Sequence, residues 1–226
     1  ETTLSSGTSL TDASHALLCL HGRGGSAQDI LGAAAWLRRP DGFHLLAPEA
    51  AGATWYPLPF TAPRTANEPH LSHALRRIDA LIDACGDAGI PESNIVLLGF
   101  SQGACLAAEY MASTPRRPGG LIAWSGGVIG ERVEPERYLS PERKGRLDGV
   151  PVFLGCSDID PHIPKTRVDE TAGILSELGA RVDCRIYPGM GHLVNEEEIQ
   201  AGSDLLRTAL EQPAPSTATS PPAKWM

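Results

Sequence analysis

The sequence predicts an α/β fold built on an open, mostly parallel, doubly wound sheet. Short continuous apolar runs, typical of strands buried on both faces, alternate along the chain with segments whose apolar residues recur every three or four positions. The 24 glycines and 19 prolines among 226 residues supply the turns between many short elements. Strands that alternate with helices form βαβ units, so we expect parallel pairing and helices on both faces of the sheet.

Most of the expected strands are short apolar runs. The first, ALLCL, is apolar throughout and leads directly into a His-Gly loop. The others lie between segments with helical periodicity, which indicates central strands of a covered sheet. In chain order the expected strands cover residues 16–20, 43–47, 95–98, 121–124, 152–155 and 181–187.

The expected helices lie between these strands. Ser26 is suited to cap the first helix, and the Gly-Ile-Pro sequence at 89–91 ends the second. Three glutamates from Glu196 onward begin the last helix, where negative charge complements the helix dipole. The five helices are expected over residues 27–39, 71–88, 102–113, 166–178 and 196–210.

Two long segments, 48–69 and 126–149, show no periodicity and are expected to be irregular. A loop of such length inside a compact domain is more often functional than idle. Residues 1–12 form a polar lead-in, and residues 212–226, rich in proline, serine and threonine, are expected to be a disordered tail. We predict one domain over residues 1–211, with no length left for a lid domain.

The charge balance limits the kinds of partner. The chain has 27 acidic and 19 basic residues, a formal net charge of −8, so we expect a small organic substrate and no nucleic acid. No run reaches the roughly 18 apolar residues of a membrane span. The five cysteines show no paired spacing and residues 1–12 do not resemble a signal peptide. These features favour a reducing, cytoplasmic setting and leave open a leader removed before Glu1.

The strongest local signal is GFSQG at residues 99–103, a G-x-S-x-G motif between a predicted strand and a predicted helix. Strand, tight turn and helix are the context in which a nucleophilic serine is lifted above the edge of the sheet. Ser101 is therefore the candidate nucleophile. A serine that only caps the following helix is the alternative.

A serine hydroxyl needs a base that is itself oriented by a carboxylate, and in this context the acid and then the histidine follow the serine along the chain. Asp160 and His192 come directly after two predicted strands, where open α/β sheets place their sites. Asp158 follows the same strand as Asp160 and competes for the role of acid. His162 is the rival base, but it does not follow a strand of its own.

Two backbone amides are needed to bind an oxyanion. The amide after the nucleophile, that of Gln102, lies at a helix N-terminus and is the first candidate. The early His-Gly loop would supply the second from Arg23, while His21 organises that loop. We expect the Arg23 guanidinium to face solvent; pairing with Glu49 or with a substrate carboxylate are the alternatives.

Four further side chains are candidates for the substrate pocket. Trp55, Tyr56 and Phe60 lie among prolines in the first long segment. They either line a pocket for an acyl or aromatic group or pack against the core and so anchor the loop. Met190, two residues before His192, either packs against a leaving group or fills its own loop.

No metal or cofactor is expected. His70 and His73 lie one helical turn apart, but no cysteine or carboxylate nearby completes a ligand set. Cys105 lies one turn after Ser101 on the side of the helix that faces the core, so we do not expect a second nucleophile there.

Together, four motifs resemble those of the phospholipase/carboxylesterase family of α/β-hydrolases: LHGRGG at 20–25, GFSQGA at 99–104, DIDPHIP at 158–164 and YPGMGH at 187–192. The resemblance covers roughly residues 16–210. It implies an α/β-hydrolase fold and a serine esterase or thioesterase, with Ser101, Asp160 and His192 as the catalytic triad and the Arg23 and Gln102 amides as the oxyanion hole. In that family the acid belongs to a D-P-x-x-P segment, which implies Asp160 in place of Asp158.

The motifs differ from those of the acyl-protein thioesterase branch of the family. The early loop reads HGRGG in place of HGLGD, and the acid segment begins CSD in place of HGD, so the chain is more similar to the small bacterial-type carboxylesterases. We therefore expect a carboxylesterase for small soluble esters. Thioester, lactone or phenolic-ester hydrolysis is the alternative, and a non-catalytic binding module is the least expected. The resemblance is also compatible with a homodimer.

Overall fold

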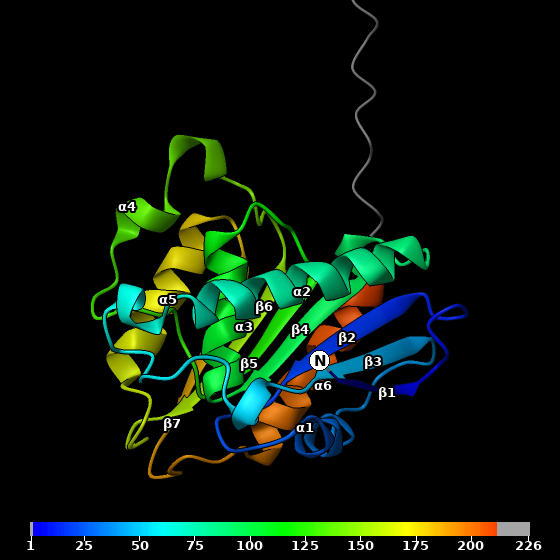
Figure 1. Cartoon of the computed structure of the whole chain (residues 1–226), viewed down its shortest axis with the longest axis horizontal. Helices are drawn as coiled ribbons and strands as arrows, with labels where there is room; N and C mark the ends of the chain where they lie inside the picture. Colours follow the sequence, from blue (N-terminus) through cyan, green and yellow to red (C-terminus); the bar gives the residue numbers. More distant parts are fainter. Residues whose placement is uncertain (1, 212–226) are drawn as a thin grey trace, which may run out of the picture.

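Seven strands form one sheet in the computed structural model, which describes residues 2–211 (Figure 1). They lie in the order β1-β3-β2-β4-β5-β6-β7, and every neighbouring pair except β1 with β3 is parallel. The predicted doubly wound, mostly parallel fold is confirmed. The strands are β1 Thr3–Gly7, β2 His15–Leu20, β3 Phe43–Pro48, β4 Ile95–Phe100, β5 Gly120–Trp124, β6 Pro151–Ser157 and β7 Arg181–Tyr187.

Strand β1 lies within the polar lead-in, where we expected no strand. It pairs antiparallel with β3 at the edge of the sheet, with Thr3 opposite Pro48 and Gly7 opposite His44. Its residues are half-buried or exposed. Because an edge strand is held by backbone hydrogen bonds to a single neighbour, it does not need the apolar run that revealed the central strands.

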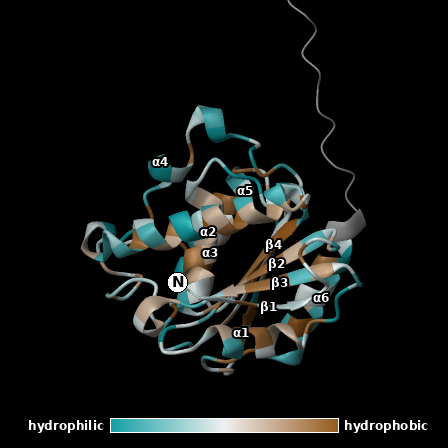
Figure 2. Cartoon of the chain, turned by 45° about the vertical axis from the view of Figure 1, so that its right-hand side comes forward, coloured by the Kyte–Doolittle hydropathy of each residue, from teal (hydrophilic) through white to brown (hydrophobic). Residues whose placement is uncertain are grey.

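Five main helices of the described chain cover the sheet on both faces, and Figure 2 shows the apolar central strands between them. The first helix ends at Ala34, earlier than expected, because Trp36 and Leu37 bond to carbonyls only three residues back. The helices α1 (Ala27–Ala34) and α6 (Glu196–Glu211) cover one face; α2 (His70–Asp87), α3 (Gln102–Ser113) and α5 (Lys165–Glu177) cover the other (Figure 1).

The two long segments contain short helical turns that the sequence did not reveal. Segment 48–69 contains η1 (Ala51–Ala53) and η2 (Arg64–Asn67), and segment 126–149 contains α4 (Pro135–Tyr138) and η4 (Pro141–Arg143). A further turn, η3 (Glu92–Asn94), precedes β4. These turns are too short for apolar periodicity to announce them.

A buried carboxylate fastens both long segments to α3. The Glu109 side chain is fully buried, and its Oε1 accepts a hydrogen bond of 2.6 Å from Arg64. Its Oε2 accepts from the amide of Ile129 and from the hydroxyl of Tyr138, each at 2.9 Å. A buried charge is tolerated only when it is paired and hydrogen-bonded, so Glu109 orders the residues that surround it.

A buried arginine adds a second connection. The Arg167 guanidinium on α5 donates to the carbonyl oxygens of Val128 and Gly130, each at 2.9 Å, and lies 5.5 Å from the ring centroid of Phe60. Phe60 belongs to the first long segment and the two carbonyls to the second. Both segments are therefore held against the α3 and α5 face of the sheet.

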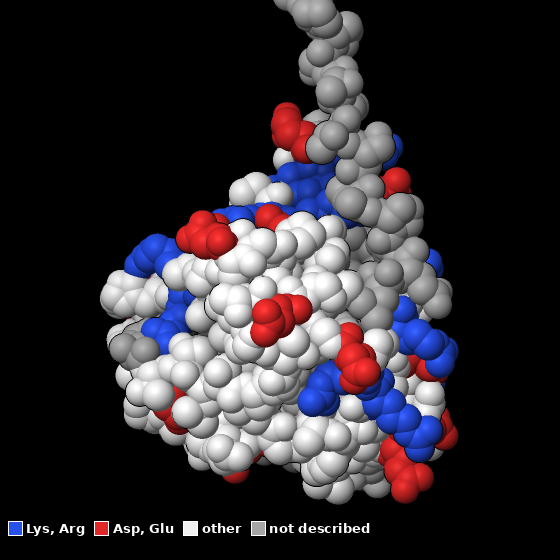
Figure 3. Space-filling view, turned by 90° about the vertical axis from the view of Figure 1, so that its right-hand side faces the viewer, with Lys and Arg blue, Asp and Glu red and all other residues white. Residues whose placement is uncertain are grey.

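The surface is of mixed charge. On the face in Figure 3, lysines and arginines lie among aspartates and glutamates and form no single basic patch. Such a face lacks the concentrated positive field that attracts a phosphate backbone. Within residues 2–211, no helix is long and apolar enough to cross a membrane.

Candidate active site

Ser101 lies in the tight turn between β4 and α3, with φ 54° and ψ −118°. This is a strained conformation for a residue with a side chain. Backbone packs closely on both sides of it: a Cβ on Gly99 would lie 2.5 Å from the amide nitrogen of Ala104, and one on Gly103 would overlap the carbonyl group of Leu20. Glycine at both positions therefore permits the turn that the motif predicted.

Three side chains from the carboxyl ends of β4, β6 and β7 form a chain of hydrogen bonds. The Oγ of Ser101 lies 2.9 Å from Nε2 of His192, and Nδ1 of His192 lies 2.7 Å from Oδ2 of Asp160. Because the carboxylate accepts the Nδ1 proton, Nε2 is left as the acceptor for the serine proton. The structure thus brings together the three residues that the motifs singled out.

The carboxylate of Asp160 is buried and fully hydrogen-bonded. Its Oδ1 accepts from the backbone amides of His162 at 2.8 Å and Ile163 at 3.0 Å, while Oδ2 accepts from His192. Burial alone would raise the pKa of Asp160, but these hydrogen bonds outweigh it and hold the pKa below its usual value. Asp160 therefore stays ionised beside the imidazole.

The rival acid has a different position. Oδ1 of Asp158 accepts from the amide of Gly189 at 2.8 Å, and the buried Ser157 hydroxyl accepts from the amide of Gly191 at 3.1 Å. Both residues thereby tie the loop that carries His192 to the end of β6. The sequence offered no signal for this role of Ser157, because its partner is a backbone group 34 residues away.

The rival base also lies close by. The His162 ring meets the His192 ring edge-on, with 4.9 Å between centroids. Phe100 contacts the same imidazole at 4.9 Å. His162 and Phe100 therefore help to hold the plane of His192.

The two predicted oxyanion donors lie beside the serine. Gly22, the residue before Arg23, packs so closely that a Cβ there would lie 3.3 Å from the Cβ of Ser101. Gln102 is the first residue of α3, where backbone amides have no partner within the helix. Within residues 2–211, neither the Arg23 amide nor the Gln102 amide has a hydrogen-bond partner. Both amides are free to bind an anion.

The side chains of the same two residues hold segment 48–69 in place. The Gln102 amide group accepts from the backbone N–H of Trp55 at 3.0 Å and donates to the carbonyl of Tyr56 at 2.8 Å. The Arg23 guanidinium donates to the carbonyl oxygens of Tyr56, Pro57 and Leu58, at 2.8, 2.9 and 2.9 Å respectively. We refer to these contacts as the Arg23–Gln102 clamp.

The clamp corrects our expectation for the Arg23 side chain. We expected a solvated guanidinium, but three consecutive carbonyl oxygens accept its protons. Glu49 does not pair with it and accepts instead from the amide of Ala27, at 2.8 Å. A planar guanidinium satisfies several carbonyls at once, which sequence spacing does not reveal because the partners lie 33 to 35 residues away.

A cavity of about 530 Å³ opens beside Ser101. Tyr56 and Phe60 line it, together with Phe100, Cys105 and Ile163. We call it the inner cavity. Its lining of aromatic, aliphatic and thiol groups suits an apolar acyl group.

Two of the four predicted pocket residues lie outside this lining. The Trp55 indole donates from Nε1 to the carbonyl of His21 at 2.8 Å and packs on the His21 ring at 5.0 Å between centroids. The Met190 sulfur accepts from the side-chain amide of Asn195 at 3.0 Å. Trp55 thus supports the His-Gly loop from behind and Met190 fills its own loop, so we no longer place either residue in the pocket.

Cys105 lines the inner cavity but is not set up as a nucleophile. Burial raises the pKa of its thiol to about 12. The reactive thiolate is therefore negligible at neutral pH. Cys105 acts as an apolar part of the cavity wall.

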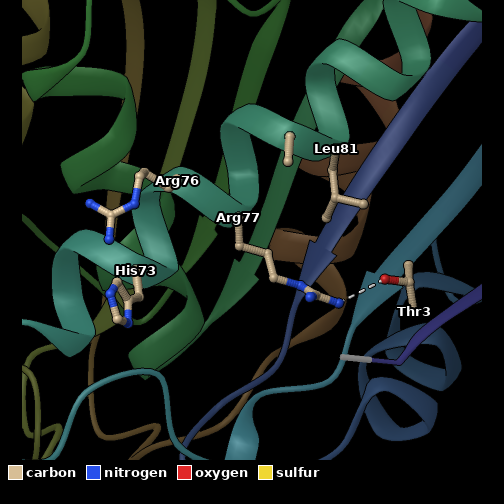
Figure 4. A pocket seen from close by; sticks show the side chains of 6 residues that line it. Thr3, His73, Arg76, Arg77 and Leu81 are labelled. Atoms are coloured by element: carbon tan, nitrogen blue, oxygen red, sulfur yellow. Dashed lines mark hydrogen bonds between the residues drawn. The ribbon is translucent and has the colours of Figure 1, made fainter.

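A separate shallow hollow lies between β1 and α2 (Figure 4). His73, Arg76 and Arg77 line it, and Arg77 donates to the Thr3 hydroxyl at 2.9 Å. Two guanidinium groups beside His73 disfavour a metal cation at this position. In the part of the chain that the structure describes, no group of three or more histidine, cysteine, aspartate or glutamate side chains is placed to hold a metal.

Comparison with known proteins now decides the family. The model of the phospholipase/carboxylesterase family matches residues 8–210. The chain belongs to this family. A phospholipase/carboxylesterase of Dyadobacter fermentans has a similar structure, with a TM-score of 0.84 and 36% identity over 91% of this chain and 95% of the other.

Curated members of the phospholipase/carboxylesterase family are also similar. A probable carboxylesterase of Oryza sativa is 28% identical over 70% of this chain, and acyl-protein thioesterase 1 of Neurospora crassa is 32% identical over 57%. The matched regions span 67% and 51% of those two relatives. Family and fold are those of carboxylic ester hydrolases, as the motifs predicted.

Proposed function

We propose that this protein is a serine hydrolase that cleaves carboxylic esters of small soluble molecules through an acyl-enzyme. The observation that carries the proposal is the hydrogen-bonded series Ser101, His192 and Asp160 at the mouth of the inner cavity. Two unpartnered backbone amides beside the serine complete the requirements for acyl transfer.

In the first half of the reaction the Ser101 oxygen attacks the ester carbonyl. Nε2 of His192 accepts the hydroxyl proton as the bond forms, and the negative oxygen of the tetrahedral intermediate binds to the Arg23 and Gln102 amides. Asp160 holds the imidazole by Nδ1 and stabilises its positive charge. The intermediate then collapses, the carbon–oxygen bond to the alcohol breaks, and His192 returns its proton to the leaving oxygen.

The second half releases the acid. Water attacks the acyl-enzyme carbonyl while His192 takes one of its protons, and the same two amides bind the oxyanion. Collapse breaks the bond to Ser101, whose oxygen regains the proton from His192. The complete cycle consumes one water molecule and returns Ser101 and His192 to their starting protonation states.

Thioesters, lactones and phenolic esters are the second class of substrate that the same residues would serve. Only the leaving atom differs, and the curated relatives include proteins named acyl-protein thioesterase. A non-catalytic role is disfavoured because His192 lies within hydrogen-bond distance of both Ser101 and Asp160. We also propose a cytoplasmic, reducing setting, since all five cysteines are free thiols and four are buried. A homodimer stays a prediction.

The proposal is tested by covalent labelling and turnover. Ser101→Ala should lose both reaction with a fluorophosphonate probe and hydrolysis of nitrophenyl esters. Ser176→Ala, at an exposed position of α5, is the matched control and should retain both. Turnover that persists in Ser101→Ala would contradict the assignment. A panel of nitrophenyl esters of increasing acyl length, run beside thioesters and aryl lactones, then ranks the substrate classes.

A further inference from the structure

A second cavity, of about 460 Å³, also borders His192. The two cavities share Gly22, Arg23, Phe100 and His192, so they meet at the reacting groups. The remaining lining comes from the early His-Gly loop, from α1 and the turn after it, from Trp124 at the end of β5, and from the two residues that follow His192. We define this leaving-group groove by Ile30, Ala33, Trp36, Leu193 and Val194.

The position of the catalytic groups decides which part of an ester enters each cavity. The inner cavity is lined by Ser101, Gln102 and Cys105, and the groove by none of these three. The acyl group stays bonded to Ser101 after the first half of the reaction, so it belongs in the inner cavity. The leaving oxygen must lie next to Nε2 of His192 to receive its proton, so the alcohol part extends toward the groove.

The groove walls indicate the chemistry of that alcohol. Trp36 is 55% exposed and Leu193 is 62% exposed, and these are two of the large apolar side chains that the fold leaves open to solvent. A planar or branched apolar group laid against them removes both from water. The carboxylate of Asp29 also lines the groove and disfavours a negatively charged leaving group.

We propose that the leaving-group groove binds the alcohol, phenol or thiol part of the substrate and selects neutral leaving groups that carry a ring or a branched alkyl chain. This inference rests on the proposed function and deepens it. Trp36 is its main specificity determinant, because its indole offers the largest apolar surface to the ring. It acts on formation of the acyl-enzyme and has no contact with the acyl group that remains.

The test varies the two parts of the ester independently. Phenyl and 2-naphthyl acetate differ in the size of the leaving group but little in its acidity, and phenyl acetate and phenyl hexanoate differ only in the acyl group. In Trp36→Ala we expect the 2-naphthyl to phenyl ratio of kcat/KM to fall about tenfold. The hexanoyl to acetyl ratio should stay within twofold of wild type.

Two further variants separate specificity from folding. Trp36→Phe keeps a ring at the groove and should restore most of the 2-naphthyl preference. Arg38→Ala is the control: Arg38 is exposed two residues after Trp36 and lines neither cavity, so both ratios should stay within twofold. Equal loss of activity toward all three esters in Trp36→Ala and Trp36→Phe would indicate a structural role and overturn the inference.

Burst kinetics gives a second readout. Both acetates form the same acetyl-enzyme, so Trp36→Ala should slow the burst with 2-naphthyl acetate and leave the rate of deacylation unchanged. A changed deacylation rate would overturn the groove assignment, and so would an unchanged 2-naphthyl to phenyl ratio of kcat/KM together with a changed oligomeric state. In either case the proposed function stands if turnover still depends on Ser101. Absence of both turnover and labelling in the wild type would overturn the two together.

Discussion

The two cavities that border His192 are built in different ways. On the inner side, segment 48–69 is held by the Arg23–Gln102 clamp and its Phe60 ring packs on Arg167. On the groove side, Trp36 and Leu193 are more than half exposed. In the proposed reaction the acyl group must keep its position through both halves, whereas the alcohol departs after the first. The difference indicates that polar contacts fix the inner cavity, whose geometry must persist through the reaction. Apolar contact is sufficient in the leaving-group groove, from which a product leaves.

Two buried glutamates, one on each face of the sheet, also differ in how fully their carboxylates are hydrogen-bonded. Glu109 on α3 supports the inner side, and both of its oxygens accept hydrogen bonds. Glu198 on α6 lies on the opposite face, next to the groove residues in sequence; its Oε2 accepts from Asn195, but Oε1 has no partner within the described chain. Burial raises the pKa of Glu198 to about 7. An oxygen without a partner makes burial of a charged carboxylate costly, as at Glu198.

The largest expected effect concerns Glu109, which holds the two long segments against α3. Glu109→Gln leaves Arg64 beside an uncharged group and removes one acceptor oxygen, so we expect the free energy of unfolding to fall by about 3 kcal/mol. Urea denaturation measures this change. Glu177→Gln, at an exposed position near the end of α5, is the control and should change the free energy by about 0.5 kcal/mol or less. Equal effects of the two variants would mean that the Glu109 contacts add no stability.

The next effect tests the clamp itself. Arg23→Ala keeps the backbone amide but removes the hydrogen bonds to three carbonyls, so the amide loses its fixed position. We expect kcat/KM for phenyl acetate to fall about 100-fold, mainly through kcat, because the oxyanion is bound only in the transition state. Steady-state kinetics beside a thermal melt separates this loss from unfolding. Arg38→Ala, an exposed arginine after α1, should keep activity within twofold. Full activity in Arg23→Ala would show that the amide holds its place without the clamp.

The smallest expected effect concerns Glu198 on α6 and the pH dependence of the free energy of unfolding. The pKa of Glu198 is about 7 in the folded chain against an ordinary value of 4.5, so the folded state holds this proton more tightly than the unfolded chain. The contribution of Glu198 to stability therefore decreases as pH rises from about 4.5 through 7. Glu198→Gln should raise the free energy of unfolding by about 2 kcal/mol at pH 8 and leave it nearly unchanged at pH 4.

Chemical denaturation at the two pH values measures that difference. Glu196→Gln, an exposed change in the first turn of the same helix, should show the same shift at both. A pH-independent effect of Glu198→Gln would mean that the carboxylate titrates alike in the folded and unfolded chains.

Local patterns revealed most of the sheet and the three residues that we propose react with the substrate. The central strands were predicted because burial on both faces requires a continuous apolar run, which is visible in any short window. Ser101, Asp160 and His192 were found because each follows a strand, and parallel strands bring their carboxyl ends to one edge. Strand β1 and the turns in the long segments left no such pattern, because an edge position or a three-residue turn needs few buried side chains.

The sequence alone determined the layered α/β architecture and the residue types that meet at its edge. Tertiary structure decided how those residues are held: Arg23 and Gln102 reach segment 48–69, Ser157 and Asp158 reach the His192 loop, and Glu109 joins both long segments. Many of these contacts end on a backbone carbonyl or amide, which every residue type carries. Because any residue type can supply a backbone partner, the sequence does not show which residue does so. Only the folded chain reveals the pairing.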